Sequence, residues 1–375
     1  MKYLFEIFFT TPIQQQNLLQ KYPLKFIFIF SIITLIIIFN YDPLQNQNTK
    51  LIKQLKEYNK KRLIYFENWL EPLNLNIKKI PEFEQFILSE KMFGQLGNQM
   101  FRFASLYAIG QVLNRTPIYD YNESQMLIID NELKETFPNF HSRIYYLKKD
   151  LNLNYTKKQF SRTCCEYVNP NILLEHNNQS KILFLTGEAN FLSIRYFDHL
   201  RPQIIKLFEF GKNIIEKSSL ISKKMFGKNT SYKICVHTRV GDFKGNGETK
   251  IEEINKIMEN LQKFLKNYLI QNTTKFSLLL FGTDLKFLKT IKINESTIVN
   301  KIYYILEANM SRGEELNFAS QNCDIFISTA PTSTFAFWMA YLMPENRPIF
   351  YISKIYPYNS KEMVRQNWIS IEGMN

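Results

Sequence analysis

Short apolar runs alternate with longer amphipathic stretches from residue 92 towards the C-terminus. The clearest apolar runs cover residues 182–185, 233–237, 276–281 and 324–328, and the clearest helical patterns cover residues 251–269 and 334–342. Continuous apolar runs of this length are typical of strands that are buried on both faces, as in parallel sheets. Strands that alternate with helices predict an α/β architecture. A chain of 375 residues has room for two such layers.

The N-terminal part of the chain has a different composition. Residues 26–41 contain no charged residue and are mostly Ile and Phe, and the run is slightly shorter than the roughly 17–25 residues of a usual bilayer span. Lys21 and Lys25 precede it and Asp42 follows it, which predicts a cytoplasmic basic flank. Because the run ends without the small residues of a processing site, an uncleaved signal anchor is favoured over a cleaved signal peptide. A buried core helix is the alternative interpretation.

These features predict five consecutive segments. They are a cytoplasmic tail (residues 1–25), a transmembrane signal anchor (26–41), a stem rich in Lys, Asn and Glu (42–90), an N-terminal domain (91–225) and a C-terminal domain (226–375). A stretch rich in Lys and Ser, residues 211–231, marks the boundary between the two domains. Eight Asn-x-Ser/Thr sequons, which begin at Asn114, Asn122, Asn154, Asn178, Asn229, Asn272, Asn294 and Asn309, agree with luminal exposure.

Charge and cysteine content exclude several classes of protein. The hydrophobic fraction of 45% excludes a disordered chain, and the net charge of +13 is spread among apolar runs without a dense basic stripe. We therefore expect no nucleic-acid partner. The four cysteines are too few for a disulfide scaffold and lack the spaced pairs of a zinc site. Cys235 and Cys323 lie in apolar strand-like runs and are predicted to be buried free thiols, whereas Cys164 or Cys165 could pair with a distant thiol.

The apolar run 233–237 leads directly into polar residues. His237 ends the run, and Arg239, Gly241 and Asp242 follow within five positions. In open parallel sheets ligands bind beyond the carboxyl ends of the strands, and a guanidinium matches two phosphate oxygens at once. Arg239 is therefore the predicted phosphate ligand. Gly241 permits a tight turn, and Asp242 could hold a guanidinium or cap the following loop.

Two further strand ends have a similar chemistry. The run 276–281 ends before Asp284, which could accept hydrogen bonds from a ribose or a base, or could cap the next helix. The run 324–328 leads into a hydroxyl-rich stretch and then an apolar helix that starts near Ser333, Thr334 and Phe335. Free N–H groups at a helix N-terminus together with hydroxyl groups predict an anion site.

A glycine-containing loop opens a helical pattern near residue 92. Its residues are Gly94, Gln95, Leu96, Gly97, Asn98 and Gln99. The loop lacks the Gly-Lys-Ser/Thr of a P-loop and the third glycine of a dinucleotide fingerprint, so neither motif is assigned. Alone, it predicts only a turn between a strand and a helix.

Together, these segments resemble the alpha-1,2-fucosyltransferase family. That family has a Gly-x-Leu-Gly-Asn-Gln segment near its start, a His-x-Arg-Arg-Gly-Asp segment midway and a Ser/Thr-Phe-x-x-Trp-x-x-Tyr-Leu-like segment late. The corresponding segments here are residues 94–99, 237–242 and 334–342, the last with Trp338. The order and rough spacing agree over about residues 92–342.

The resemblance implies an inverting glycosyltransferase of the GT-B kind, in which two Rossmann-like domains face a central cleft. It also implies that residues 91–225 form the acceptor-side domain and residues 226–375 the nucleotide-sugar-binding domain. It implies GDP-fucose as donor substrate, with no cofactor, and the 2-hydroxyl of galactose in a glycan acceptor. Arg239 and His237 are the catalytic candidates. The predicted nucleotide-sugar ligands are Arg239, Asp242, Asp284, Ser333, Thr334, Phe335, Gly97, Asn98 and Gln99. The expected location is the Golgi membrane, as a single-pass type II protein with a luminal catalytic domain.

Three features leave alternatives open. Val240 stands where the family has its second arginine, and Arg102 or Arg312 is the hypothetical replacement. An Asp-x-Asp metal motif is absent, so we expect no metal site. His237 could act as a general base or make a structural or nucleotide contact. The rival functions are a protein O-fucosyltransferase or another GT-B transferase, and a catalytically inactive, membrane-tethered glycan-binding protein.

Overall fold

The fold is taken from a computed structural model, which describes residues 85–371 except 92, 121–122, 148–154, 162–164, 178, 188–190, 246, 270–274, 294–298 and 354–359. Two compact units divide the chain, and residues 58–373 form the unit that contains every described element. The predicted tail and signal anchor, and the stem up to residue 84, lie outside the described residues. Within the described part of the chain, no helix is both long enough and apolar enough to cross a membrane.

The first half of the described chain forms a five-stranded parallel sheet in the order β3-β2-β1-β5-β4. Its strands are β1 (Phe86–Ser89), β2 (Thr116–Asp120), β3 (Tyr145–Leu147), β4 (Tyr155–Ser161) and β5 (Ile182–Gly187). Its helices are α5 (Leu96–Leu113), α6 (Ser124–Thr136), α7 (Pro138–His141), η1 (Pro170–His176), η2 (Ile194–Tyr196), η3 (Asp198–Leu200), α8 (Arg201–Leu207) and α9 (Lys212–Phe226). Parallel neighbours require crossover connections, and these helices provide several of them.

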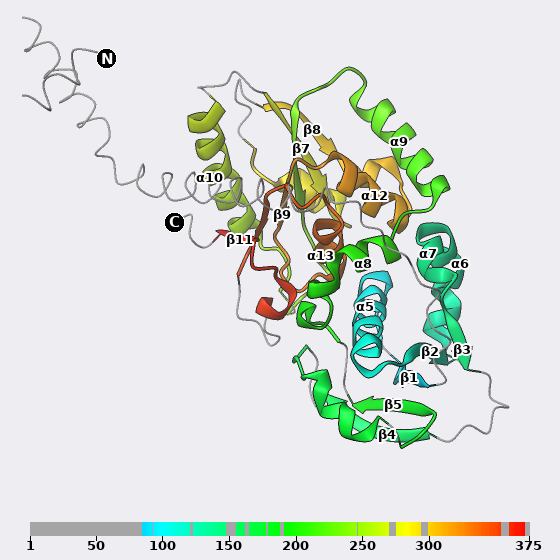
Figure 1. Ribbon diagram of the computed structural model, residues 1–375. Helices are drawn as coiled ribbons and strands as arrows, with labels where there is room; N and C mark the ends of the chain where they lie inside the picture. The colour runs from blue at the N-terminus through cyan, green and yellow to red at the C-terminus, as the bar shows by residue number, and fades with distance from the viewer. Residues whose placement is uncertain are drawn as a thin grey trace, which may run out of the picture. The chain divides into compact units, whose positions relative to one another are not determined.

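The second half forms a six-stranded parallel sheet in the order β11-β10-β9-β6-β7-β8. Its strands are β6 (Tyr232–His237), β7 (Phe276–Phe281), β8 (Val299–Tyr304), β9 (Ile325–Ser328), β10 (Ile349–Tyr351) and β11 (Ile369–Ser370). Its helices are α10 (Ile251–Leu269), α11 (Leu285–Thr290), η4 (Ile305–Ala308), α12 (Arg312–Asn322), α13 (Thr334–Tyr341) and η5 (Ser360–Met363). In Figure 1, α10 and α12 lie on opposite sides of the strands β7 and β9.

The α/β class with parallel sheets is confirmed, and so are the four predicted strands and the two predicted helices. The central strands β6, β7 and β9 are almost completely buried, which explains their continuous apolar sequences. The boundary between the stem and the first domain was wrong. β1 is the middle strand of the first sheet, yet it lies inside the predicted stem 42–90. The stretch rich in Lys and Ser, residues 211–231, contains the amphipathic helix α9, which packs against α12, and the second sheet begins directly after it at Tyr232.

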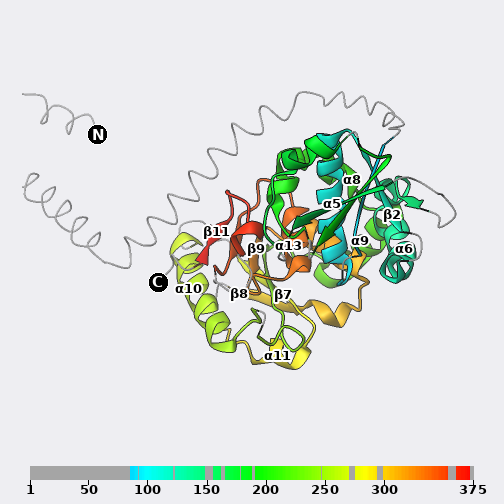
Figure 2. The same ribbon diagram turned by 90° about the horizontal axis from the view of Figure 1, so that it is seen from below.

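The two sheets share one continuous hydrophobic core. Helix α5 is buried on nearly every side, as expected for a helix that is apolar all round. It lies beside α13 of the second half, and both views show this arrangement (Figures 1 and 2). The fully buried ring of Trp338 has its centroid 5.3 Å from that of Phe101 on α5 and 5.6 Å from that of Phe197. The predicted central cleft between two domains stays a prediction.

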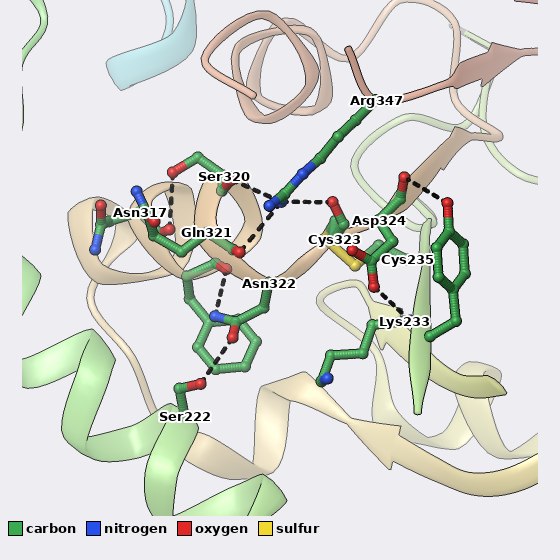
Figure 3. The surroundings of a disulfide bond; sticks show 12 residues. Ser222, Lys233, Cys235, Asn317, Ser320, Gln321, Asn322, Cys323, Asp324 and Arg347 are labelled. Atoms are coloured by element: carbon green, nitrogen blue, oxygen red, sulfur yellow. Dashed lines mark hydrogen bonds between the residues drawn. A yellow bond between two sulfur atoms is a disulfide. The ribbon is translucent and has the colours of Figure 1, made fainter. Parts of the chain in front are cut away.

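A disulfide bond joins Cys235 of β6 to Cys323, the residue that ends α12, with a Cα–Cα distance of 5.5 Å (Figure 3). The prediction of two buried free thiols was therefore wrong. The two residues are buried in apolar surroundings, but the pairing of β6 with β9 brings them together, and this pairing is not visible in the sequence. Cys165 is also disulfide-bonded. Its partner is neither Cys235 nor Cys323, because these two are bonded to each other.

Helix α12 is held firmly at both ends. At its start, Ser311 and Glu314 form a capping box, and Gly313 packs against Thr136 of α6. At its end, Nη1 of Arg347 donates hydrogen bonds to the carbonyl oxygens of Ser320, Gln321 and Cys323 (Figure 3). With the disulfide, these contacts fix α12 relative to β6.

Candidate functional site

The carboxyl ends of β6, β7 and β9 lie side by side. In the parallel register, His237 of β6 pairs with Phe281 of β7 and with Ser328 of β9. The amide of Thr238 donates to the carbonyl of Phe281 at 2.9 Å, which continues the pairing one residue beyond the strands. The three strand ends selected from the sequence therefore meet at one edge of the second sheet, where ligands of open α/β sheets bind.

Arg239 is oriented by its own loop. Its Nε lies 2.9 Å from Oδ1 of Asp242 and its Nη2 lies 2.5 Å from Oδ2, a bidentate ion pair. The guanidinium carbon also lies 4.8 Å from the ring centroid of Phe243. Gly241 has a φ of 79°, which closes the turn between the two ion-paired residues. Asp242 thus holds a guanidinium, which is one of its two predicted roles.

The loop that follows Arg239 packs against the connection between β9 and α13. The amide of Arg239 donates to Oγ1 of Thr249 at 3.0 Å, and this hydroxyl lies 2.9 Å from Oγ1 of Thr329. Gly247, with a φ of 82°, lies so close to this connection that a Cβ would be 3.1 Å from Oγ1 of Thr332. The loop that continues from the second motif therefore contacts the segment that leads into the third motif.

The glycine loop contacts the start of α13. Nε1 of Trp338 donates to the carbonyl of Gly97 at 2.9 Å, and Oγ1 of Thr334 donates to Oδ1 of Asn98 at 2.6 Å. These partners are 241 and 236 residues apart in the chain. Gln99 is fully buried, and its Nε2 donates to the carbonyl of Gly94 at 3.4 Å. The structure thus brings the first and third motifs together.

A methyl group at Gly97 should force this contact apart. A Cβ there would lie 2.8 Å from the amide nitrogen of Phe335 and 2.8 Å from Oγ1 of Thr334. Because backbone atoms cannot move aside easily, we expect Gly97→Ala to destabilise the fold by about 1–3 kcal/mol, the usual cost of overpacking. We also expect weaker binding of the nucleotide. Urea denaturation and calorimetric titration with GDP measure the two effects.

The matched control for this prediction is Gly227→Ala. Gly227 has a φ of 53°, and no atom lies within 4 Å of the position that its Cβ would take. This variant strains the backbone at the end of α9 without touching the motifs, so GDP affinity should not change. Equal GDP affinity in Gly97→Ala and the wild type would contradict a role of the glycine loop in the site.

At the helix N-terminus, the structure assigns a local partner to each predicted hydroxyl. Oγ of the buried Ser333 accepts the amide of Ala336 at 3.3 Å and caps α13. Thr334 bonds to Asn98, and the half-buried Phe335 follows within the first turn. The anion site at this terminus stays a prediction. Asp284 is exposed and caps α11, since its Oδ1 accepts the amide of Phe287 at 3.0 Å.

Both arginines proposed as a substitute for the missing second arginine form ion pairs with residues of the first half of the chain. Arg102 is fully buried under the first sheet, where it pairs with Glu123 at 2.7 Å and donates to Ser89. The guanidinium of Arg312 forms a bidentate ion pair with Glu132 of α6, and its Nη1 donates a hydrogen bond to Oε1 of Gln95. Arg102 is poorly placed to contact a ligand, because its side chain is fully buried and paired with Glu123. Arg312 instead links α12 to the glycine loop.

His237 is a neutral group. Burial, together with the positive charge of Arg239, lowers the pKa of its imidazole to about 3. A base with such a pKa is poorly matched to proton transfer near neutral pH. Its Nδ1 is buried and has no hydrogen-bond partner among the described residues. These properties favour a neutral hydrogen-bonding role over that of a general base, and the catalytic role of His237 stays a prediction.

Glu315, in the first turn of α12, was not selected from the sequence. The residue is half-buried. Burial raises the pKa of its carboxyl to about 7, and the nearby guanidinium of Arg239 opposes this rise. The capping box of Ser311 and Glu314 was a sequence signal for the start of this helix. It does not reveal that the helix faces Arg239, because this depends on the packing of α12 against the sheet.

The raised pKa of Glu315 predicts a pH effect on stability. Between pH 4.5, the ordinary pKa of a glutamate, and about pH 7, Glu315 binds a proton in the folded state but not in the unfolded state. This extra proton stabilises the folded state at low pH, and the stabilisation is lost as the pH rises to about 7. We therefore expect the free energy of unfolding of Glu315→Gln, relative to that of the wild type, to rise between pH 5 and pH 8. Urea denaturation at both values measures this difference. The control Glu307→Gln changes an exposed glutamate paired with Lys289 and should keep the wild-type dependence.

A metal site is not visible in the described part of the chain, where no three His, Cys, Asp or Glu side chains cluster suitably for a metal ion.

Comparisons with known proteins agree with the three motifs. The family model described as glycosyl transferase family 11 matches residues 49–372. A putative galactoside 2-alpha-L-fucosyltransferase of Caenorhabditis elegans, svh-11, is 30% identical over 267 residues, which cover 69% of this chain and 68% of that protein. A galactoside 2-alpha-L-fucosyltransferase of the same organism is 25% identical over 298 residues, which cover 73% and 72%.

Among solved structures, the fucosyltransferase NodZ from Bradyrhizobium is 12% identical, with a TM-score of 0.45 over 69% of this chain and 94% of that chain. The assignment of the family rests on the sequence matches, since the family model extends over both sheets and all three motifs. The chain belongs to glycosyl transferase family 11, the alpha-1,2-fucosyltransferase family that its motifs resemble.

Proposed function

We propose that the protein transfers fucose from GDP-fucose to the 2-hydroxyl of a galactose unit in a glycan, with inversion at the anomeric carbon and without a metal ion. The observation behind this proposal is the arrangement of the three motifs around the segment between β9 and α13. Arg239 follows β6, its loop packs against the connection between β9 and α13, and the glycine loop contacts the start of α13. Two relatives named as galactoside 2-alpha-L-fucosyltransferases support the choice of sugar and linkage.

The proposed reaction is a displacement at the anomeric carbon of fucose. The acceptor oxygen forms a bond to this carbon, the bond between the carbon and the β-phosphate oxygen breaks, and the hydroxyl proton leaves to a base. The electron pair of the broken bond stays on GDP, so negative charge grows on the β-phosphate. Arg239, held by Asp242 and only 18% exposed at its side chain, is a fixed positive charge where this negative charge develops. The helix α13 follows the neighbouring strand β9, and its N-terminus adds aligned backbone N–H groups.

The test is a transfer assay with the full-length chain. GDP-fucose, GDP-mannose and UDP-galactose serve as donors, a β-galactoside serves as glycan acceptor, and a folded protein domain serves as the competing acceptor. We expect fucosylation of the galactoside from GDP-fucose, with an alpha-1,2 linkage detected by NMR. Transfer to the protein domain alone would identify a protein O-fucosyltransferase instead.

A catalytically inactive glycan-binding protein is the second candidate, and one observation favours it. Val240 occupies the position of the second motif arginine, while Arg102 and Arg312 are engaged elsewhere. Such a protein would bind a galactoside without producing GDP from GDP-fucose. The same assay distinguishes the two, because released GDP is measured independently of glycan binding.

We further propose that the domain lies in the lumen of the Golgi, anchored by residues 26–41. The apolar run with its preceding lysines supports an N-terminal anchor. The disulfide between Cys235 and Cys323 supports an oxidising compartment, because structural disulfides are rare in the cytosol. Protease protection of the chain in intact microsomes, lost after detergent is added, is the expected result.

A further inference from the structure

An aromatic side chain is displayed beside the glycine loop. Phe93 is 70% exposed and follows β1, the central strand of the first sheet, by four residues. It therefore lies beyond the carboxyl edge of a parallel sheet, the edge at which ligands bind in open α/β folds. The proposed donor ligand Arg239, by contrast, follows a strand of the other sheet.

The backbone under this ring is fixed to the site. The carbonyl of Phe93 accepts a hydrogen bond from Nδ2 of Asn98 at 3.2 Å, and Oδ1 of Asn98 accepts one from Thr334 at 2.6 Å. Gly94 has a φ of 101°, and a Cβ there would lie 2.2 Å from Nδ2 of Asn98, so the turn has no room for another side chain. Two hydrogen bonds through Asn98 thus connect the backbone of Phe93 to the first residue of α13.

Polar groups lie over the ring of Phe93 and at the neighbouring strand end. Nζ of Lys91 lies 5.5 Å from the centroid of Phe93. The carboxyl of Glu90 accepts the amide of Gly187, which ends the adjacent strand β5, at 3.0 Å. A flat apolar face beside charged and polar groups matches the two-sided surface of a hexose, whose C–H groups cover one face while its hydroxyls need hydrogen bonds.

We propose that Phe93 is the stacking platform for the galactose ring of the acceptor glycan, with Lys91 beside it as a hydrogen-bond donor to the sugar hydroxyls. This inference rests on the proposed function and adds the position of the acceptor. It explains why a large apolar side chain is exposed at a position where the backbone is rigid, since a preformed platform loses little entropy when the sugar binds.

Direct binding of methyl β-galactoside to the full-length chain tests this inference. In saturation-transfer NMR, the wild type should bind the galactoside, and Phe93→Ala should weaken that binding roughly five- to thirty-fold, as expected for the loss of part of an aromatic contact. Phe93→Tyr keeps the ring and should keep the affinity. In the transfer assay, the KM for the acceptor should rise by a similar factor in Phe93→Ala, while the KM for GDP-fucose should not change.

Tyr155 offers a matched control. It is 54% exposed, and Nζ of Lys157 lies 5.6 Å from its ring centroid, so it also pairs an exposed ring with a lysine. It is the first residue of β4 and therefore lies at the opposite, amino edge of the same parallel sheet. Tyr155→Ala should leave the binding of methyl β-galactoside unchanged.

The outcomes separate this inference from the proposed function. If Phe93→Ala binds the galactoside as tightly as the wild type, or if Tyr155→Ala weakens binding equally, the inference is wrong. Failure of the wild type to bind the galactoside would also overturn it. If the galactoside binds through Phe93 but no transfer from GDP-fucose occurs, the proposed transferase function fails while the platform remains.

Discussion

Arg239→Ala should lower the turnover of GDP-fucose roughly ten- to a hundred-fold, the loss expected for a charge-assisted contact of about 1.5–3 kcal/mol. GDP should also bind more weakly, because the diphosphate is negative before and after transfer. The fold should survive the change. The ion-pair partner Asp242 is 59% exposed and stays hydrated when the guanidinium is removed. Initial rates and calorimetric titration with GDP provide the two measurements.

Arg195→Ala is a matched control for this prediction. Like Arg239, Arg195 combines an ion pair with a ring contact, since it lies 3.7 Å from Glu362 and 4.0 Å from the ring centroid of Tyr167. It belongs to η2 and not to a loop at a strand end of the second sheet. Its loss should leave turnover and GDP affinity intact. Wild-type turnover in Arg239→Ala would remove the basis of the proposed phosphate site.

Loss of the disulfide between Cys235 and Cys323 should have the largest effect on stability. The bond closes a loop with a sequence separation of 88 residues. A cross-link over a loop of this length stabilises a fold by about 2–5 kcal/mol, mostly by restricting the unfolded chain. We expect the double variant Cys235→Ala/Cys323→Ala to unfold about 4–10 °C below the wild type. Differential scanning calorimetry measures the shift.

Variants that change only one of the two cysteines test the same prediction. Either Cys235→Ala or Cys323→Ala alone already removes the bond, so each should lose nearly as much stability as the double variant. A reducing agent alone is not a sufficient test, because Cys165 is also disulfide-bonded. The removal of two buried sulfur atoms also costs some stability through lost packing. A loss in the double variant no larger than this packing contribution would show that the bond does not form in the wild type. GDP affinity should fall as well, since α12 would be held less firmly relative to β6.

The strands and helices that could be predicted are those whose burial follows a regular pattern along the element. The strands β6, β7 and β9 are buried on both faces, so nearly every residue in them is apolar and the run itself marks the strand. Helix α10 has one buried face, with Ile254, Met258 and Leu261 at helical spacing. Shorter edge strands such as β3, with half-exposed residues, lack such a pattern and were not predicted.

The candidate site was predictable only where a single residue type has a distinctive chemistry. Arg239 could be selected because a guanidinium directly after a buried strand has few structural explanations, and Asp242 because of its spacing from it. Glu315 could not be selected. Its raised pKa results from burial by elements distant in sequence, and a glutamate in the first turn of a helix is ordinary in itself. The unavailability of Arg102 is likewise a consequence of packing.

The sequence by itself determined the α/β class, the three motifs and the residues at the strand ends, because apolar runs and turn residues act over a few positions. The tertiary structure alone decided that Cys235 bonds to Cys323, that Trp338 holds the glycine loop, and that α12 faces Arg239. These contacts join residues far apart in the chain, and the order of strands in the sheet places them together. Local sequence patterns contain no information about that order.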